Sequence, residues 1–384
     1  MKLAIHRTVE VQRSARVLQL SGLFDLPPTE RSETSWSVSL PVEEEPWQIG
    51  LIVGPSGSGK TTLVREAFPD APFVSANTGY EWPEDRAVVD GFPEGLSIKD
   101  VTGALSSVGF SSPPAWLRPY RCLSTGEQFR ATVARALVDP AGLVVLDEFT
   151  SVVDRLVAQI GSAAVSKAVR RVPAKKIVCV TCHYDVEEWL CPDWIVEMPS
   201  GTFTRRSLRR RPAIDFEVTR VHRQAWELFR QHHYLDKNIN NAGQCYLATV
   251  KGQPAAFVSA MHFPHPIRSG WREHRAVCLP DFQGVGLGNA MSEFVASLYR
   301  ATGKPYRSIT GNPAMIRHRA KSPLWKTVTK PTLGSKLPTG KRKNAQVADA
   351  MRRYSQTTAT NRLIATFEYV GPIRTAEAIG FGVV

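Results

Sequence analysis

Residues 48–62 are Gln48-Ile-Gly-Leu-Ile-Val-Gly-Pro-Ser-Gly-Ser-Gly-Lys-Thr-Thr62, an apolar run that leads directly into a glycine-rich loop. The run is typical of a buried strand, and the residues after the loop are typical of a helix start. Such glycines let backbone N–H groups surround a phosphate, while the lysine reaches its outer oxygens and a hydroxyl ligates Mg²⁺. We therefore predict an ATP site with Mg²⁺ at Thr61. Its expected residues are Gly54, Pro55, Ser56, Gly57, Ser58, Gly59, Lys60, Thr61 and Thr62.

A second apolar run, Gly142-Leu-Val-Val-Leu-Asp147-Glu148, ends in two carboxylates. Taken alone, such a pair is also typical of the acidic first turn of a helix. Beside a phosphate loop, however, phosphoryl transfer needs positioned charge more than covalent chemistry. We expect Asp147 to bind Mg²⁺, usually through water, and Glu148 to be the catalytic residue that orients the attacking water.

A third motif lies between these two. Leu123-Ser-Thr-Gly-Glu-Gln-Phe-Arg130 and the helix-like residues after it resemble the signature of ABC-type ATPases. The resemblance implies that Ser124 and Gly126 contact a γ-phosphate held by the opposing subunit, and therefore a head-to-tail homodimer. Asp154 resembles the D-loop aspartate of this family. His183 resembles its switch histidine, which implies a catalytic contact with the γ-phosphate.

Two features depart from the family pattern. No glutamine occurs between Lys60 and Ser124, so the Q-loop glutamine is absent, and we expect Asp90 to stand in for it. The upstream aromatic residue that stacks on adenine is not evident. Trp47 and Phe24 are candidates, although a core or surface role suits each of them better.

Charge divides the chain. Residues 1–204 contain 19 Lys and Arg against 25 Asp and Glu, whereas residues 205–384 contain 29 against 10. An arginine-rich run lies where the two regimes meet, which predicts an ATPase domain at 1–204, a basic linker at 205–213 and a second domain at 214–384. No stretch approaches the roughly 20 apolar residues that span a bilayer. We expect a cytoplasmic protein without a membrane segment of its own.

The second half contains another strand, glycine loop and helix. Two strand-like runs, 245–250 and 255–260, predict a hairpin, and Pro280-Asp-Phe-Gln-Gly-Val-Gly-Leu-Gly288 precedes an amphipathic helix. This loop resembles motif A of GNAT acetyltransferases. The expected fold is therefore α/β, a P-loop ABC-type ATPase domain followed by an α+β GNAT-like acyl-CoA N-acyltransferase domain. The resemblance implies binding of acetyl-CoA or another acyl-CoA by Val277, Leu279, Gln283, Gly284, Val285, Gly286, Leu287 and Gly288.

The catalytic residues of this second site are less well marked. Glu273 occupies the position of the glutamate that is the general base in part of the GNAT family. A solvated strand carboxylate beside Arg272 and Arg275 is an equally good interpretation. The tyrosine that protonates the leaving thiolate is missing, and Trp325 stands near its position. His318 or water is then the expected acid, unless the domain is not catalytic.

The C-terminal region is strongly basic, and Lys341, Arg342 and Lys343 are expected to contact nucleic acid, DNA or RNA. The predicted function is an ATPase fused to an acyltransferase that modifies a nucleic acid. Two alternatives remain open. One is an ATP-driven clamp with a non-catalytic binding domain, and the other is a transporter ATPase subunit with an appended regulatory domain.

Overall fold

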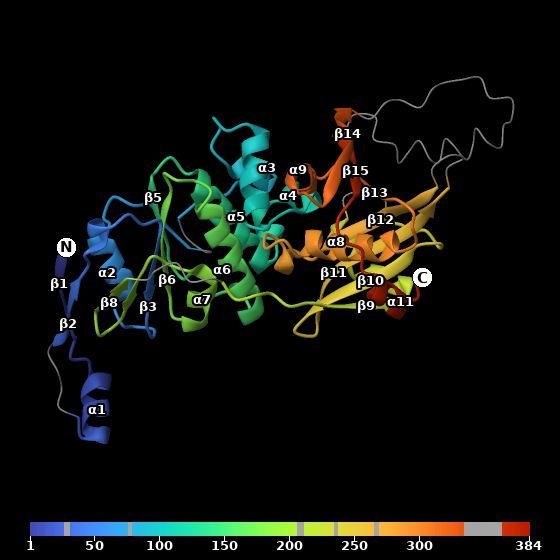
Figure 1. Cartoon of the computed structure of the whole chain (residues 1–384). Helices are drawn as coiled ribbons and strands as arrows, with labels where there is room; N and C mark the ends of the chain where they lie inside the picture. Colours follow the sequence, from blue (N-terminus) through green and yellow to red (C-terminus); the bar gives the residue numbers. More distant parts are fainter. Residues whose placement is uncertain (27–30, 76–78, 206–210, 234–236, 265–268, 334–362) are drawn as a thin grey trace. The chain divides into compact units, whose positions relative to one another are not determined.

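Contacts divide the chain into two units (Figure 1). The first contains Met1–Glu81 and Thr132–Pro212, and the second contains Trp82–Ala131 and Ala213–Val384. The computed structural model describes residues 1–26, 31–75, 79–205, 211–233, 237–264, 269–333 and 363–384. Among these residues, no helix is long and apolar enough to cross a membrane.

The apolar run before the phosphate loop forms β3 (Ile49–Val53), and all of its residues are buried. A strand buried on both faces is typical of a parallel sheet covered by helices. β3 lies in a sheet of the first unit with the order β4-β5-β6-β3-β7-β8, in which only the β7–β8 pair is antiparallel. The other strands are β4 (Phe73–Val74), β5 (Leu143–Leu146), β6 (Lys176–Thr181), β7 (Trp194–Glu197) and β8 (Thr202–Arg205).

Because β5, β6 and β3 are parallel neighbours, the loops that follow them leave the same edge of the sheet. This edge carries the predicted phosphate loop. The helical elements of the unit are α1 (Ala15–Phe24), η1 (Val42–Glu44), α2 (Lys60–Ala67), α6 (Arg155–Val169), η4 (Tyr184–Val186) and α7 (Glu187–Leu190).

A long hairpin precedes the sheet. β1 (Lys2–Glu10) pairs with β2 (Arg31–Ser39) over the full length of both strands. α1 lies at the far end of this hairpin, and none of its residues is buried (Figure 1). The core of the unit lies beneath the base of the hairpin, where Trp47, Phe68 and Trp194 pack together.

The second unit is built on a seven-stranded sheet with the order β14-β15-β13-β12-β11-β10-β9. The predicted hairpin is present as β10 and β11, joined through Lys251 and Gly252. Both of these residues have positive φ, which matches the twist of a two-residue hairpin turn. The strands are β9 (Glu217–Val221), β10 (Gln244–Val250), β11 (Gln253–Phe263), β12 (Gly270–Cys278), β13 (Tyr306–Thr310), β14 (Trp325–Leu333) and β15 (Leu363–Tyr369).

One pair in this sheet is parallel, β12 with β13, and α8 (Leu287–Arg300) connects the two strands. The pairing covers only Trp271 with Tyr306 and Arg272 with Arg307, so the two strands separate beyond that point. The remaining helical elements of this unit are η2 (Val88–Gly91), α3 (Ile98–Ser107), α4 (Pro113–Trp116), η3 (Tyr120–Cys122), η5 (Arg223–Leu228), η6 (Arg230–His232), η7 (Pro280–Phe282), α9 (Pro313–Lys321) and α11 (Thr375–Gly380).

The division differs from the sequence-based boundaries in two places. Residues 82–131, expected in the ATPase domain, cluster with the C-terminal half, and the boundary falls inside α5 (Thr125–Val138). Arg205, expected in the linker, is the last residue of β8 and donates to the carbonyl of Val42. The contacts also divide the two units between Pro212 and Ala213, inside the stretch predicted as the basic linker.

Candidate functional sites

The phosphate loop runs from the end of β3 to the start of α2. Gly57 (φ 77°) and Gly59 (φ 88°) adopt left-handed backbone conformations that side chains with a Cβ rarely tolerate. Gly59 caps α2, and the N–H groups of the first turn have no acceptor within the helix. Lys60 Nζ donates to the carbonyls of Gly54 (2.8 Å) and Pro55 (2.7 Å), which holds its charge over the same loop.

The two residues expected to hold Mg²⁺ lie next to each other. Thr61 Oγ1 donates to Asp147 Oδ2 at 3.1 Å, although Thr61 lies in the first turn of α2 and Asp147 directly follows β5. A hydroxyl and a carboxylate are the hard oxygen ligands that Mg²⁺ takes in phosphate sites, so the residues present fit the ion. Glu148 follows with an exposed side chain and a φ of 53°. A non-glycine residue in this conformation carries strain of about 1–2 kcal/mol, as is common at functional sites.

Asp154 and His183 belong to the same unit. Asp154 is the N-cap of α6, where its Oδ1 accepts from the N–H of Val157 at 3.0 Å. This capping role accounts for the aspartate without any ligand. His183 is half-buried directly after β6, and its N–H donates to Thr181 Oγ1 at 3.1 Å. β6 lies between β5 and β3, so His183 follows the same sheet edge as Asp147.

The structure places a third aromatic residue at the phosphate loop. A Cβ added at Gly59 would come within 2.7 Å of the indole of Trp36, so this ring lies against the loop. The two candidates from the sequence do not lie in comparable positions. Trp47 is buried in the core, and Phe24 is 66% exposed on α1. Trp36 lies within β2, between the two candidates in the sequence, and the alternation of this strand was the signal that could have pointed to it.

The signature residues are in the second unit. Ser124 Oγ accepts from the N–H of Glu127, and Glu127 Oε2 accepts from the N–H of Ser124, which is a capping box at the start of α5. Ser124 is exposed and Gly126 is half-buried. Asp90, the expected substitute for the missing glutamine, is exposed in η2 of the same unit. These three residues belong to a different unit from the phosphate loop. Their contact with ATP therefore stays a prediction.

Part of the chain is similar to ATP-binding proteins of metal import. It is 32% identical over 129 residues to the zinc import ATP-binding protein ZnuC of Pseudomonas aeruginosa (strain UCBPP-PA14), covering 29% of this chain and 46% of that protein. ZnuC of Cereibacter sphaeroides is 34% identical over 159 residues (37% and 62%). The Fe(3+) ions import ATP-binding protein FbpC of Pseudomonas fluorescens (strain Pf0-1) is 33% identical over 137 residues (27% and 39%).

The chain carries an ABC-type ATP-binding domain. It spans about half the length of the curated relatives it matches. Solved structures that match part of the chain include the dimeric post-hydrolysis state of the ATP-binding cassette MJ0796 bound to ADP and Pi (14% identity, TM-score 0.37, 55% of this chain and 100% of that chain). Another is cbiO1 from Clostridium perfringens, part of the ABC transporter complex cbiONQ (20% identity, TM-score 0.32, 41% and 75%). No family model matches the chain.

Outside the ABC-type domain, the second glycine loop lies between β12 and α8. Gly284 (φ 88°) and Gly286 (φ 103°) have left-handed conformations, and Gly286 caps α8. In the described part of the chain, nothing lies within 4 Å of a Cβ built at Gly286, so the space beside this glycine is open there. At Gly288 a Cβ would lie 3.2 Å from Cys278 Cβ, which shows how closely α8 packs on β12. Leu287 is buried, and Val285 is half-buried.

Other residues expected around acyl-CoA have structural contacts of their own. Val277 is buried, and Leu279 packs against the same apolar cluster, which includes Trp226 and Phe257. β13 does not pair with β12 beyond Arg272, so the β12 edge next to Val277 is not occupied by that strand. The Gln283 side chain bonds to the backbone on both sides, through Nε2 to Cys278 O (2.7 Å) and through Oε1 to Ser111 N–H (2.7 Å).

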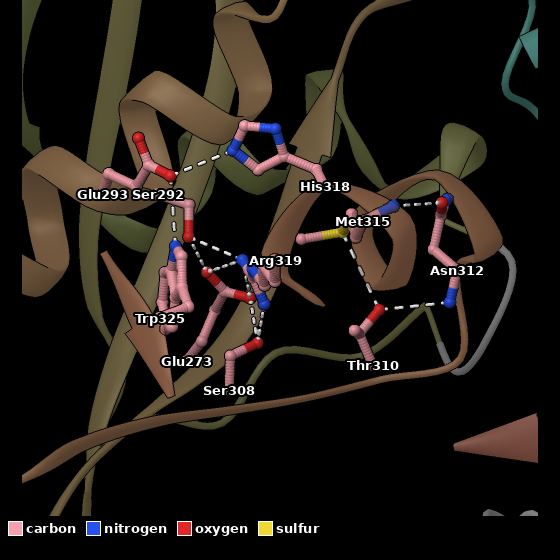
Figure 2. A network of polar contacts seen from close by, with 10 residues as sticks. All are labelled: Glu273, Ser292, Glu293, Ser308, Thr310, Asn312, Met315, His318, Arg319 and Trp325. Atoms are coloured by element: carbon pink, nitrogen blue, oxygen red, sulfur yellow. Dashed lines mark hydrogen bonds and ion pairs between the residues drawn. The ribbon is translucent and has the colours of Figure 1, made fainter. Parts of the chain in front are cut away.

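Glu273 lies in a buried polar network (Figure 2). Both of its carboxylate oxygens accept from Arg319 at 3.2 Å, and each also accepts a serine hydroxyl, from Ser292 or Ser308. The side chains of Glu273 and Arg319 are 6% and 1% exposed. The carboxylate is buried, so the interpretation as a solvated strand carboxylate is wrong. A general base would have to release one of these hydrogen bonds to take a proton, and that role of Glu273 stays a prediction.

Close to this network lie His318, the expected acid, and Trp325, which stands near the position of the missing tyrosine. His318 Nε2 lies 3.0 Å from Glu293 Oε1, and Trp325 Nε1 donates to the same oxygen at 3.1 Å (Figure 2). The Arg319 guanidinium lies over the Trp325 ring, 4.3 Å from its centroid. Trp325 therefore has a structural role in the network. Lys341, Arg342 and Lys343 lie outside the described residues.

Proposed function

We propose that the chain binds and hydrolyses Mg²⁺-ATP and that it does so as a head-to-tail homodimer. The observation that carries this proposal is the 3.1 Å contact between Thr61 Oγ1 and Asp147 Oδ2 at the sheet edge that also bears Lys60 and Glu148. Together these residues provide a phosphate loop, a cation, two oxygen ligands and an exposed carboxylate. The similarity of part of the chain to metal-import ATP-binding proteins supports the same chemistry.

Each of these residues has a separate task in the proposal. Backbone N–H groups at the start of α2 and Lys60 Nζ hold the β- and γ-phosphates. Thr61 and Asp147 would hold Mg²⁺, which would supply positive charge against the negative charge that develops on the phosphate. Glu148 accepts a hydrogen bond from the attacking water and orients it, and His183 contacts the γ-phosphate from the neighbouring strand end. Trp36, which lies against Gly59, is placed to stack on the base.

Two substitutions test this assignment. Lys60→Ala removes the phosphate contact, so nucleotide binding is lost. Glu148→Gln keeps the contacts that bind ATP and removes the carboxylate that orients water, so binding persists while hydrolysis slows severely. Wild-type ATPase rates in purified Glu148→Gln would show that another residue orients the water.

We further propose that this ATPase drives a transporter as its ATP-binding subunit. The similarity to ZnuC and FbpC favours this alternative over the nucleic-acid hypothesis, for which the comparisons offer no support. Cells in which Lys60→Ala replaces the wild-type chain should then differ in zinc or iron content, measured by elemental analysis. Equal metal content in the two strains would count against the transport of these ions.

The second unit favours a second candidate function, acyl-CoA binding. Three features support it together: the separation of β12 from β13, the glycine loop that follows β12, and the open space before Gly286. The positive end of a helix dipole suits a pyrophosphate. In acyl transfer, an acceptor nitrogen attacks the thioester carbonyl and gives up a proton, the C–S bond breaks, and the leaving thiolate takes up a proton, so the products are an amide and a free thiol. His318 is our proposed proton donor.

Calorimetry with the full chain and acetyl-CoA tests this second candidate. Binding in the absence of ATP is expected, because the loop and the ATP site are built from separate residues. No detectable heat at any concentration would remove the transferase and leave the transporter proposal standing. A nucleic-acid acceptor stays a prediction that rests on charge alone.

A further inference from the structure

Arg130 is a buried cation that joins two segments far apart in the sequence. It lies on α5, six residues after Ser124, and its side chain is almost completely buried, with 1% of the residue exposed. One guanidinium nitrogen donates to the carbonyls of Val108 (2.7 Å) and Gln283 (3.4 Å). The other donates to the carbonyl of Asp281 (2.9 Å). Arg130 therefore holds the chain directly before the second glycine loop.

A second set of contacts reinforces the same junction. The N–H of Ser111 donates to the side-chain Oε1 of Gln283 at 2.7 Å. At Gly109, which has a φ of 87°, the backbone lies close to both Arg130 and Gln283. An added Cβ would lie 2.3 Å from an Arg130 nitrogen and 2.4 Å from the carbonyl oxygen of Gln283. Both contacts meet at Gln283, the first residue of the glycine loop, so the junction fixes where that loop begins.

Burial of this guanidinium has a chemical consequence. Burial lowers the pKa of Arg130 to about 10, partly offset by the charge of Asp281. The group therefore stays protonated at neutral pH, and a buried charge is tolerated only when it is paired or hydrogen-bonded. Its hydrogen bonds to three carbonyls are charge-assisted and directional. Separating the two segments would remove the carbonyls of Asp281 and Gln283 and leave only that of Val108 among these partners.

α5 connects this junction to the predicted ATP contacts. Ser124 caps the helix and Gly126 lies in its first turn, while Arg130 follows little more than one turn later. A helical segment this short moves as one piece with the side chains it carries. Nucleotide that engages Ser124 and Gly126 therefore acts on the same element that holds Asp281 and Gln283.

We propose that Arg130 is a positioning residue that couples nucleotide at the signature helix to the glycine loop at residues 283–288. The proposal rests on the ATP and acyl-CoA sites proposed above. ATP that contacts Ser124 reduces the conformational freedom of α5. Through the bonds of Arg130, the conformational freedom of the loop falls as well. Acetyl-CoA then binds a loop that has already lost conformational freedom, so its affinity rises. By linkage, acetyl-CoA raises ATP affinity by the same factor.

The test measures acetyl-CoA affinity with and without Mg²⁺-ATP in the full chain, in a Glu148→Gln background that retains ATP. We expect ATP to tighten acetyl-CoA binding by about 5-fold or more. Arg130→Met should bring this ratio close to one, because methionine fills the space without bonding the three carbonyls. Arg130→Lys, which keeps the charge with fewer donors, should restore part of the ratio.

Matched controls separate this coupling from a general loss of stability. Arg121→Met removes an exposed arginine of the same segment, one that pairs only with exposed Asp85, and should keep the wild-type ratio. Gly109→Ala should lower the ratio by forcing the junction apart, whereas Gly103→Ala, whose Cβ would meet only an Arg317 nitrogen at 4.0 Å, should not. Gly109→Ala also serves if Arg130→Met does not fold.

Hydrogen exchange distinguishes the ways in which the proposal can fail. In the same proteins, Mg²⁺-ATP should slow amide exchange at residues 278–288, and Arg130→Met should remove this effect. If acetyl-CoA never binds but exchange still responds to ATP through Arg130, the acyl-CoA function is wrong and the coupling stands. If both ligands bind and neither the affinity nor the exchange responds to ATP, the coupling is wrong. Equal responses in Arg130→Met and wild type would also overturn it.

Discussion

Glu273 and Arg319 are a fully enclosed ion pair between a strand and a helix. Each loses its hydration on folding, and their mutual bonds with Ser292 and Ser308 offset that cost. Removing one partner of such a pair leaves an unpaired buried charge. The pair therefore holds α9 against β12 near the point where β12 and β13 separate, and its role is to shape the site.

Replacing Glu273 tests this structural role. Glu273→Gln should lower the free energy of unfolding of the second unit by about 3–5 kcal/mol. Glu368→Gln is the matched control, since its pair with Arg307 is partly exposed and should contribute about 1 kcal/mol or less. Urea unfolding gives both values. A Glu273→Gln protein with wild-type stability but no transferase activity would favour the general-base role instead.

In the first unit, Asp193 is likewise a carboxylate that pairs with an arginine, Arg170. Burial alone would raise the pKa of its carboxyl, but bonds from Arg170 and from the N–H groups of Gln48 and Ile49 outweigh burial and hold the pKa below its usual value. Because the folded pKa is depressed, the stabilisation is present above the unfolded pKa. It is lost as the pH falls through the folded pKa.

Asp193→Asn should therefore destabilise the first unit at pH 7, by about 1–3 kcal/mol, the usual cost of losing hydrogen bonds to a charged group. The difference from wild type should shrink once the pH falls below about 4, where the unfolded carboxyl takes its proton. Denaturant unfolding at pH 7, 5 and 3 measures it. Exposed Asp70→Asn is the control, and a difference that is independent of pH would contradict the assignment.

At this scale, the sequence predicts residues whose partners are close in the chain. The phosphate loop and the capping box of Ser124 and Glu127 depend on local spacing, so each could be recognised without a structure. Arg319 and Trp36 could not, because their partners Glu273 and Gly59 are 46 and 23 residues away and only the fold brings them together.

Among the elements, α8 carries the site that substitution can test most cleanly. Gly286 at its start and Gly303 just beyond its end both have positive φ, 103° and 73°, and a Cβ at either would meet nothing within 4 Å. The same substitution at both positions therefore introduces similar backbone strain and the same charge.

Gly286→Glu should abolish acetyl-CoA binding, because the carboxylate enters the space where the pyrophosphate is proposed to lie and repels it. Gly303→Glu should bind acetyl-CoA as the wild type does. Calorimetry on both proteins, with melting temperatures to confirm folding, gives the comparison. Equal loss of binding in the two variants would point to strain rather than to a site at the loop.

The sequence predicted the elements better than their grouping. β3, β5, β10 and β11 follow apolar or alternating runs, so their existence was accessible from periodicity. The unit to which residues 82–131 belong could not be predicted from periodicity. This segment looks like part of the ATPase domain by its position in the chain, and only the contacts of Arg130 and Ser111 with Gln283 place it with the C-terminal half.

For the whole molecule, the distribution of charge separates the nucleic-acid hypothesis from the transporter proposal. The chain has a formal charge of +13, and its excess of Lys and Arg lies beyond residue 204. A polyanion bound by this surface releases counterions, so its affinity must fall with salt. An ATPase subunit that engages a membrane protein has no such requirement.

We therefore predict that, if nucleic acid is a partner, log affinity of the full chain for duplex DNA falls linearly with log salt. Each phosphate contact adds a slope of about 0.9, so replacing Lys341, Arg342 and Lys343 by Ala should flatten the slope by about 2 to 3 units.

The control is Arg7, Arg16 and Arg31→Ala, which removes the same charge from exposed positions in the acidic half. Because net charge changes equally in both, only a local contact can separate the two variants. Affinity that does not change between about 50 and 200 mM salt, or equal slopes in the two variants, would exclude this partner.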